Sequence, residues 1–221
     1  MGGASHRLAG SFLLCPAIPQ TAMEWSKLQD EKELFIRDMI LSNTIGAAFQ
    51  WARVYKEKPK NENQSQWDEK KEEFRKDIGI YLVEVGERYD PINDHCERIQ
   101  NFKKEINNAR NYDILVRDEI SFGVAQKLVN LYLKYLWCLG KFDIPPHCPI
   151  DRLVINEGCQ HPNRYHPWTQ MPQEKYVDAM NEIKQKAGNE SLAVWELNLW
   201  NDRTSVDKPG RKKSEKDLQI K

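Results

Sequence analysis

The sequence lacks an excess of charge of either sign. Its 221 residues include 33 lysines and arginines and 33 aspartates and glutamates, so the formal net charge at pH 7 is zero. A strongly basic composition is the usual electrostatic mark of a protein that binds nucleic acid. The overall charge therefore does not identify a nucleic-acid partner, and any such surface must be local.

Closely spaced cysteines are also missing. The five cysteines are odd in number and irregularly spaced, and no two of them form a Cys-X-X-Cys motif. A secreted protein held together by disulfides typically shows an even number of cysteines in a compact framework. We therefore expect reduced thiols and a cytoplasmic location, with association with the nucleoid if the protein is prokaryotic.

No apolar run is long enough to cross a membrane. The run LAGSFLLC near the N-terminus is too short to span one and makes a poor secretion signal. We expect residues 1–23 to form a flexible leader, unless translation begins at Met23. Residues 203–221 carry seven basic and three acidic residues among proline, glycine and serine, which predicts a disordered basic tail or a DNA-binding arm.

Apolar residues recur at helical spacing through residues 24–202, which we expect to form a single domain. Neither an internal repeat nor a convincing pair of strands is visible, so the predicted fold class is all-α. A polar stretch, Leu41–Thr44, interrupts the first helical pattern and predicts a joint between helices or a site. Helices are predicted over residues 31–56, 67–89, 90–106, within 107–121, from just after Gly123 to Gly140, from Asp151, and over 172–187 and 189–201.

The stretch Phe122–Gly140 is apolar on almost all sides, which is typical of a helix at the centre of a domain. Its exceptions, Lys127, Asn130 and Lys134, are spaced three and four residues apart and would form one narrow polar stripe. We place Lys127 near the first turn of this helix, where both burial and the helix dipole favour an uncharged amine. Such an amine is a nucleophile. The alternative is a lysine that extends its charge to water.

Asp151 follows a loop in which three prolines prevent regular structure. If this loop runs back along the central helix, the carboxylate of Asp151 faces the amine of Lys127. The carboxylate could then stabilise oxocarbenium-like charge on a sugar while the amine captures C1′ as a Schiff base. Backbone amides of residues 123–125 could hold a phosphate. The alternative is that Asp151 only caps a helix.

Three motifs resemble those of the helix-hairpin-helix DNA glycosylases. Phe122–Lys127 resembles the hairpin of that family and the lysine used by its bifunctional members. The segment from Gly140 to Asp151 resembles the loop that ends in the catalytic aspartate. Ile40–Thr44 resembles a stretch that ends an early helix and contacts DNA. The order of the motifs matches, and the resemblance implies two packed helical lobes with a cleft between them.

This resemblance implies a DNA base-excision glycosylase, bifunctional with AP-lyase activity, that acts as a monomer on double-stranded DNA containing a damaged base. It implies no cofactor and no membrane contact. Lys127 would be the nucleophile and Asp151 the electrostatic stabiliser. The implied DNA-binding residues are Gly123, Val124, Ala125, Gln126, Ser42, Asn43 and Thr44, with Asn43 as a candidate wedge. The implied base pocket draws on Asn130, Lys134, Phe142 and Trp168.

The sequence also departs from the family. Ala125 replaces the second hairpin glycine, Leu128 and Val129 replace a small pair, and the loop before Asp151 is longer than in the branch with an iron-sulfur cluster. The four cysteines of that cluster are absent, since none follows Cys159. These departures indicate an outlying, cluster-free branch, or a relative that has kept the fold and lost the activity.

Two other functions remain open. Histidine and cysteine are dense in residues 147–166, and a metal could be bound by Cys148, Cys159, His161 and His166, although their spacing fits no familiar zinc module. Alternatively, the protein is a non-catalytic all-α protein that binds nucleic acid or a protein partner. In that case Lys127 has only a structural role.

Overall fold

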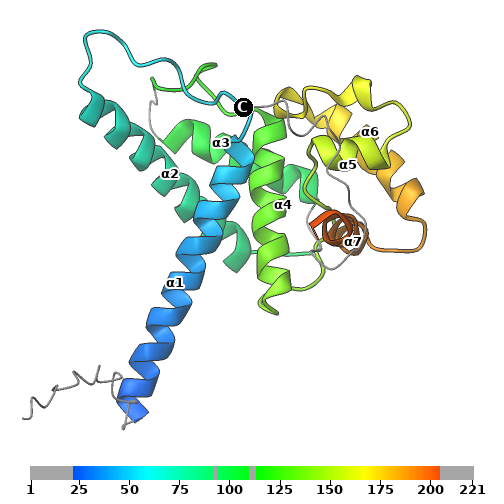
Figure 1. Ribbon diagram of the computed structural model, residues 1–221, viewed down its shortest axis with the longest axis horizontal. Coiled ribbons are helices and arrows are strands. Elements are labelled where there is room, and N and C mark those ends of the chain that lie inside the picture. Colours follow the sequence, from blue (N-terminus) through cyan, green and yellow to red (C-terminus); the bar gives the residue numbers. More distant parts are fainter. Residues whose placement is uncertain (1–21, 92–93, 110–112, 205–221) are drawn as a thin grey trace, which may run out of the picture. The chain divides into compact units, whose positions relative to one another are not determined.

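The computed structural model describes residues 22–91, 94–109 and 113–204, and every regular element within them is helical (Figure 1). The prediction of an all-α fold is therefore confirmed. No helix of the described residues is long and apolar enough to span a membrane. The helices are α1 (Ala22–Phe49), α2 (Gln64–Glu87), α3 (His95–Ala109), α4 (Phe122–Cys138), α5 (Arg152–Gly158), α6 (Gln173–Ala187) and α7 (Leu192–Thr204), with the 3-10 helices η1 (Pro162–Tyr165) and η2 (Trp168–Gln170).

The chain divides into two compact units, residues 1–38 and residues 39–221. In the first unit, the described part of α1 exposes the apolar side chains of Leu34 and Phe35. The second unit contains the rest of α1 and all the other helices. Residues 1–21 of the expected leader and 205–221 of the expected tail lie outside the described residues, whereas Ala22 and Met23 already belong to α1.

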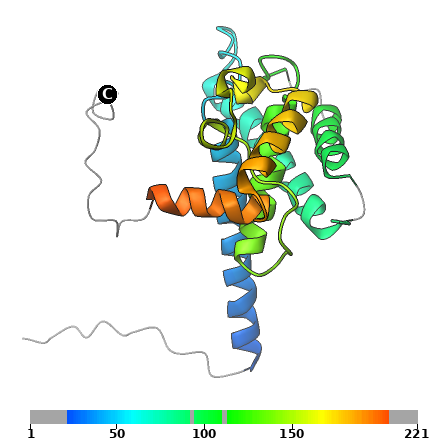
Figure 2. The ribbon, with the colours of Figure 1, turned by 90° about the vertical axis from the view of Figure 1, so that its right-hand side faces the viewer.

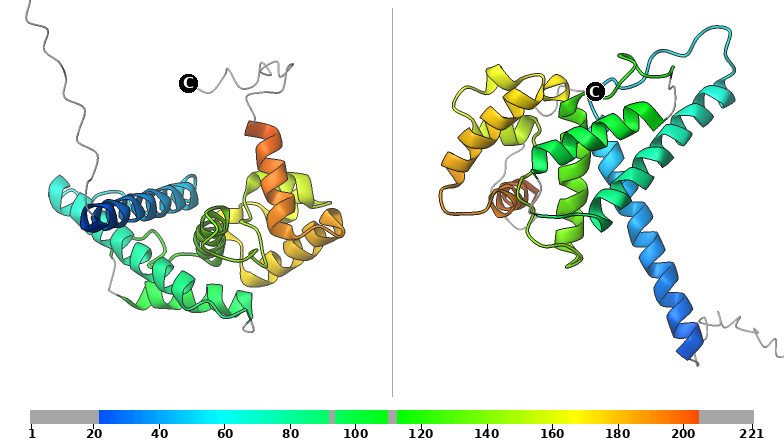
Figure 3. Two further views of the ribbon diagram at one scale, coloured as in Figure 1. Left: turned by 90° about the horizontal axis from the view of Figure 1, so that it is seen from below. Right: turned by 180° about the vertical axis from the view of Figure 1, so that it is seen from behind.

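Helix α4 is the buried axis of the second unit, as its apolar composition predicts. Every residue from Phe122 to Asn130 is buried. The helix contacts α2 and α3 as well as α6 and η2. Seen along its axis, α4 separates α2 and α3 from α5, α6 and α7 (Figure 3, left). Helix α7 runs steeply across the direction of α4 (Figures 1 and 2), and Glu196 of α7 pairs with Lys134 in the second half of α4.

The polar stretch Leu41–Thr44 does not break α1, so the predicted joint between helices is wrong. Ile40, Thr44, Ile45 and Ala48 are buried at helical spacing, while Ser42 and Asn43 face solvent on the same continuous helix. The helix ends at Phe49 rather than near residue 56, because the backbone turns to positive φ at Trp51.

Two further predictions about element boundaries need correction. Helix α3 begins at His95, where the side chain of Asp94 accepts a hydrogen bond from the Glu97 amide at 2.9 Å, and not at Asp90. No short helix forms in residues 113–121. That segment contains turns and an isolated antiparallel bridge between Leu115 and Tyr55.

Candidate functional site

Ser121 sets the start of α4. Its Oγ accepts a hydrogen bond from the Val124 amide at 3.1 Å and donates one to the Thr169 carbonyl at 2.5 Å. The helix therefore begins at Phe122, before Gly123 and not after it. Gly123 is needed for a different reason, because a Cβ there would lie 2.0 Å from the Trp168 carbonyl oxygen. This close approach packs η2 against the first turn of α4.

The same packing bears on the predicted phosphate cradle at residues 123–125. All three residues are buried. The amide of Val124 donates to Ser121 Oγ, and the amide of Ala125 donates to the Ser121 carbonyl at 3.0 Å. These amides are already hydrogen-bonded within the protein, and η2 packs against Gly123, so this turn does not form an open cradle for a DNA phosphate.

Gln126 holds the proline-rich loop beside α4. Its Nε2 donates to the Ile150 carbonyl at 2.7 Å, and its Oε1 accepts from the Ile150 amide at 3.0 Å. The backbone amide and carbonyl of Ile150 are thus both hydrogen-bonded to the one buried side chain of Gln126. Because Gln126 precedes Lys127 and Ile150 precedes Asp151, the clamp places the next two residues beside each other.

Lys127 and Asp151 meet, as the sequence predicts. Lys127 Nζ donates to Asp151 Oδ2 at 3.2 Å, with side-chain exposures of 10% for the lysine and 26% for the aspartate. The amine does not extend into water. It lies 4.6 Å from the centre of the Trp168 ring, the geometry of a cation–π contact. The catalytic role of the pair stays a prediction.

Asp151 is also the N-cap of α5, as the alternative interpretation of this residue predicts. The helix cap and the ion pair with Lys127 are therefore both present. Its Oδ1 accepts hydrogen bonds from the amides of Leu153 at 2.9 Å and Val154 at 3.2 Å. One carboxylate oxygen is therefore fixed by the helix, while the other faces the lysine. This division holds the charge of Asp151 in one orientation.

A second buried ion pair lies farther along α4. Lys134 Nζ donates to Glu196 Oε2 at 2.5 Å, with side-chain exposures of 9% and 7%. Burial raises the pKa of Glu196, outweighing the opposing effect of Lys134. Asp151 raises this pKa further and Lys127 lowers it, so the two ion pairs interact electrostatically. Sequence reasoning missed Glu196, although a lone carboxylate inside the apolar run LAVWELNLW is a usable signal.

The four residues predicted to form a base pocket make different contacts, and their role in binding a base stays a prediction. Asn130 is completely buried and fully engaged in hydrogen bonds within the core. Phe142 makes an edge-to-face contact with Tyr89, with ring centroids 4.8 Å apart. The four have separate neighbours: Asn130 with His95, Lys134 with Glu196, Phe142 with Tyr89 and Trp168 with Lys127.

Residues 42–44 lie in the middle of α1 and not at its end. Ser42 and Asn43 are exposed, whereas Thr44 is buried and its Oγ1 has no hydrogen-bond partner among the described residues. No hydrogen bond or ion pair in the described part of the chain joins these residues to Lys127 or Asp151. The role of Ser42, Asn43 and Thr44 in DNA binding stays a prediction.

The alternative metal site is not formed by the described residues, none of which gather into a cluster of three or more metal ligands. Cys148 and Cys159 are buried, and burial raises the pKa of both thiols, that of Cys159 to about 12. His161 is exposed, and His166 Nε2 lies 3.2 Å from the side-chain oxygen of Asn156. Protonated, buried thiols are poor metal ligands.

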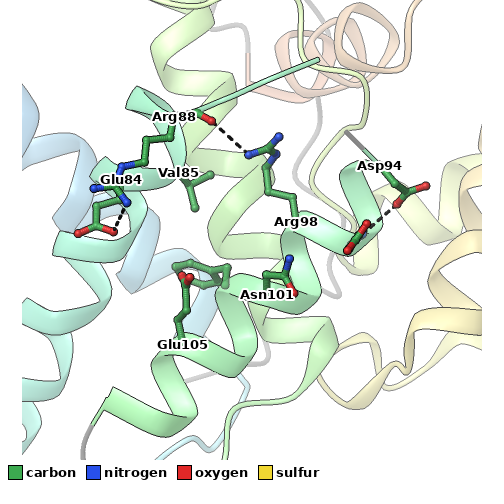
Figure 4. A pocket seen from close by; sticks show the side chains of 9 residues that line it. Glu84, Val85, Arg88, Asp94, Arg98, Asn101 and Glu105 are labelled. Atoms are coloured by element: carbon green, nitrogen blue, oxygen red, sulfur yellow. Dashed lines mark hydrogen bonds and ion pairs between the residues drawn. The ribbon is translucent and has the colours of Figure 1, made fainter. Parts of the chain in front are cut away.

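Three surface grooves lie elsewhere on the second unit. One, of about 320 Å³, runs between α2 and α3, where Arg98 donates to the Arg88 carbonyl and Glu84 pairs with Arg88 (Figure 4). Another, of about 540 Å³, contains Phe142. The third, of about 440 Å³, contains His147. None of these three is lined by Lys127 or Asp151.

Comparisons with known proteins give no relative for this chain. No family model matches it, no curated protein is similar to it, and no solved structure matches its fold. A function must be argued from the chemistry of a site and not from the fold alone. The described site offers two buried amine–carboxylate pairs, each beside a tryptophan ring.

Proposed function

We propose that Lys127 and Asp151 are the reactive centre of a DNA base-excision enzyme of the helix-hairpin-helix class, a glycosylase with AP-lyase activity. The contact of 3.2 Å between the amine and the carboxylate carries this proposal. The two groups come from segments that are 24 residues apart in the sequence, and Gln126 holds those segments together. The two-lobed fold of that class is part of the proposal.

The chemistry requires an amine that can lose a proton. Asp151 Oδ2 is placed to accept this proton from Lys127, while Oδ1 remains bound to the α5 amides. The freed amine then attacks C1′ of the sugar as the bond from C1′ to the base breaks, and the base leaves with the proton that Asp151 accepted. The C1′–O4′ bond then opens and O4′ takes a proton from the attached nitrogen, which gives a Schiff base; on a site that already lacks its base, the amine condenses with the C1′ aldehyde and water leaves. Removal of a C2′ proton from the Schiff base expels the 3′ phosphate.

Substrate access sets a condition on this proposal. Trp168 covers the amine of Lys127, so DNA binding must move η2 or the proline-rich loop before the sugar can reach Nζ. The amides of residues 124 and 125 have internal partners, and the proposal does not use them as a phosphate cradle. It retains only the lysine and the aspartate from the family resemblance.

A second candidate is a non-catalytic helical protein that binds nucleic acid or a protein partner. It is favoured by the internal pairing of all three polar residues of the α4 stripe: Lys127 with Asp151, Lys134 with Glu196, and Asn130 with His95. Buried polar groups need such partners for stability alone. In this candidate the stripe is entirely structural.

Borohydride trapping separates the two candidates. The protein is incubated with a duplex carrying one abasic site, reduced, and examined for a covalent adduct on a denaturing gel. We expect an adduct in the wild type and none in Lys127→Ala. Lys175→Ala removes an exposed lysine of α6 and should retain the adduct. Asp151→Asn keeps a side-chain oxygen for the α5 cap and should slow adduct formation by at least about tenfold.

The absence of an adduct with wild-type protein on abasic and damaged duplexes would reject the lyase proposal. If the protein still binds the duplex in a gel-shift assay, the result would support a non-catalytic protein that binds nucleic acid. If it does not bind the duplex, the result would support a non-catalytic protein that binds a protein partner. If the adduct forms, duplexes with single oxidised, alkylated or deaminated bases identify the lesion.

A further inference from the structure

A chain of buried hydrogen bonds determines the orientation of Asn130. Gln126 Nε2 donates to the carbonyls of Gly123 and Ile150, so Gln126 Oε1 must be the acceptor that faces Asn130 Nδ2 at 3.3 Å. Asn130 Nδ2 also lies 3.2 Å from the Cys148 carbonyl, which can only accept. The amide nitrogen of Asn130 therefore points towards these acceptors, and its oxygen points the other way.

This orientation determines the protonation of two histidines. Asn130 Oδ1 can only accept, so His95 Nε2, at 2.7 Å, carries a proton, and Nδ1 accepts from Tyr89. The fully buried hydroxyl of Tyr176 faces Asn130 Nδ2 on one side and His147 Nδ1 on the other, at 2.8 Å. Only His147 Nδ1 can accept the hydroxyl proton there. The proton of the neutral His147 ring is therefore on Nε2.

Burial keeps both rings neutral. Together with the neighbouring His95, which has a smaller effect, burial lowers the pKa of His147 to about 3. Burial also lowers the pKa of His95, against the effect of its hydrogen bond to Asn130. The two rings pack edge to face, with centroids 4.7 Å apart. His147 thus offers an N–H donor without a positive charge near neutral pH.

His147 lines the groove of about 440 Å³ between the first turn of α3 and α6, and its Nε2 has no hydrogen-bond partner among the described residues. Asp94 and Glu97 supply two carboxylates to the lining, which contains no lysine or arginine. Val177 and Met180 supply apolar surface. The volume is in the range of small-molecule sites.

We propose that this groove binds a small organic cation that also carries a hydrogen-bond acceptor, such as an ammonium group next to a carbonyl oxygen. The oxygen accepts from His147 Nε2–H, and the cationic group lies near Asp94 and Glu97. The amides of Gln173 and Asn181 lie at the same groove and can orient the ligand. This site is independent of the lysine–aspartate pair and of its proposed activity.

Nitrogen-detected NMR of the histidine rings tests the proposal at neutral pH. We expect His147 to show a neutral ring with the proton on Nε2. Glycinamide, which carries an ammonium group and a carbonyl oxygen, should shift this signal in a saturable manner. Ethylamine lacks the acceptor, acetamide lacks the charge and acetate has the opposite charge, so each should bind at least about threefold more weakly.

Variants test whether the carboxylates of Asp94 and Glu97 bind the cationic group of the ligand. Asp94→Asn combined with Glu97→Gln keeps the cap of α3 and should weaken glycinamide binding at least about threefold. Glu174→Gln with Asp178→Asn removes two exposed carboxylates of α6 that do not line the groove, and should leave binding unchanged. A His147 proton on Nδ1, no shift with glycinamide, or equal binding of acetate would each overturn the proposal.

Discussion

Lys127 and Lys134 lie about two helical turns apart on α4, and each has the same two kinds of neighbour. Their amines are 3.2 Å and 2.5 Å from the carboxylates of Asp151 and Glu196. Each amine also lies within 6 Å of the centre of a tryptophan ring, at 4.6 Å and 5.9 Å. This repeated arrangement explains how an apolar helix can bury two lysines, because each charge is paired where it leaves water.

Breaking the ion pair between Lys134 and Glu196, the more buried of the two pairs, should destabilise the protein strongly. Lys134→Met leaves the Glu196 carboxylate buried and unpaired, which should lower the free energy of unfolding by about 3–5 kcal/mol. Lys134→Met with Glu196→Leu removes both charges and should recover most of this loss. Urea denaturation measures both. Lys56→Met breaks an exposed pair with Asp118 and should cost less than about 1 kcal/mol. Equal losses for Lys134→Met and Lys56→Met would contradict the prediction.

Two glycine-to-alanine substitutions should have opposite effects. Gly123→Ala places a Cβ against the Trp168 carbonyl and should lower the free energy of unfolding by about 1–3 kcal/mol or more. Gly46→Ala, in α1, meets no atom within 4 Å and should raise it by about 0.5–1 kcal/mol. Chemical denaturation of the two variants side by side provides the comparison. If Gly123→Ala were as stable as wild type, η2 would not pack on α4 as described.

Removing the Gln126 clamp should loosen the loop before Asp151. Gln126→Leu leaves the amide and carbonyl of Ile150 without their partner, at a cost of about 1–3 kcal/mol for each buried group. We expect a lower free energy of unfolding and faster hydrogen exchange at the Ile150 amide. Gln170→Leu, at an exposed position of η2, is the control and should change neither quantity. An unchanged exchange rate at Ile150 would show that another group holds the loop.

The half-buried His147 should make stability depend on pH. Its pKa is about 3 in the folded protein, against 6.5 for a histidine in the unfolded chain, so its stabilising contribution is present above pH 6.5 and is lost as the pH falls towards 3. Between pH 6 and pH 4, the free energy of unfolding of wild type should fall more steeply than that of His147→Phe, by up to about 1.4 kcal/mol per pH unit. His161→Phe, at an exposed site, serves as the control. Parallel pH profiles for wild type and His147→Phe would contradict this assignment.

The helical class and the core of α4 could be predicted because they depend on local pattern. Ile99, Phe102 and Ile106 of α3 are buried at helical spacing, and α6 ends at Ala187, the last residue of its predicted range. The helical class and the core of α4 are encoded within short stretches of sequence. The contact between Lys127 and Asp151 was predicted only on the condition that the proline-rich loop runs back along the helix, and the hydrogen bonds between Gln126 and Ile150 meet that condition.

The start of α3 was mispredicted because Asp90-Pro91 and Asp94 are both plausible caps, and packing chooses between them. The turn at Gly123 was misjudged for a similar reason. A glycine can permit a sharp turn or a close approach, and only the position of Trp168 shows which applies. Glu196 was missed because its partner, Lys134, is 62 residues away.

By itself, the sequence determined that the described chain is helical, that α4 is buried and that its polar residues form one stripe. Periodicity is sufficient for this, because it reports which face of a helix leaves water. Only the tertiary structure decided what each polar residue meets: a carboxylate and a tryptophan for each lysine, and two neutral histidines in the network around Asn130. Such partners are distant in sequence, and their protonation follows from burial and hydrogen bonds that form only when the chain is folded.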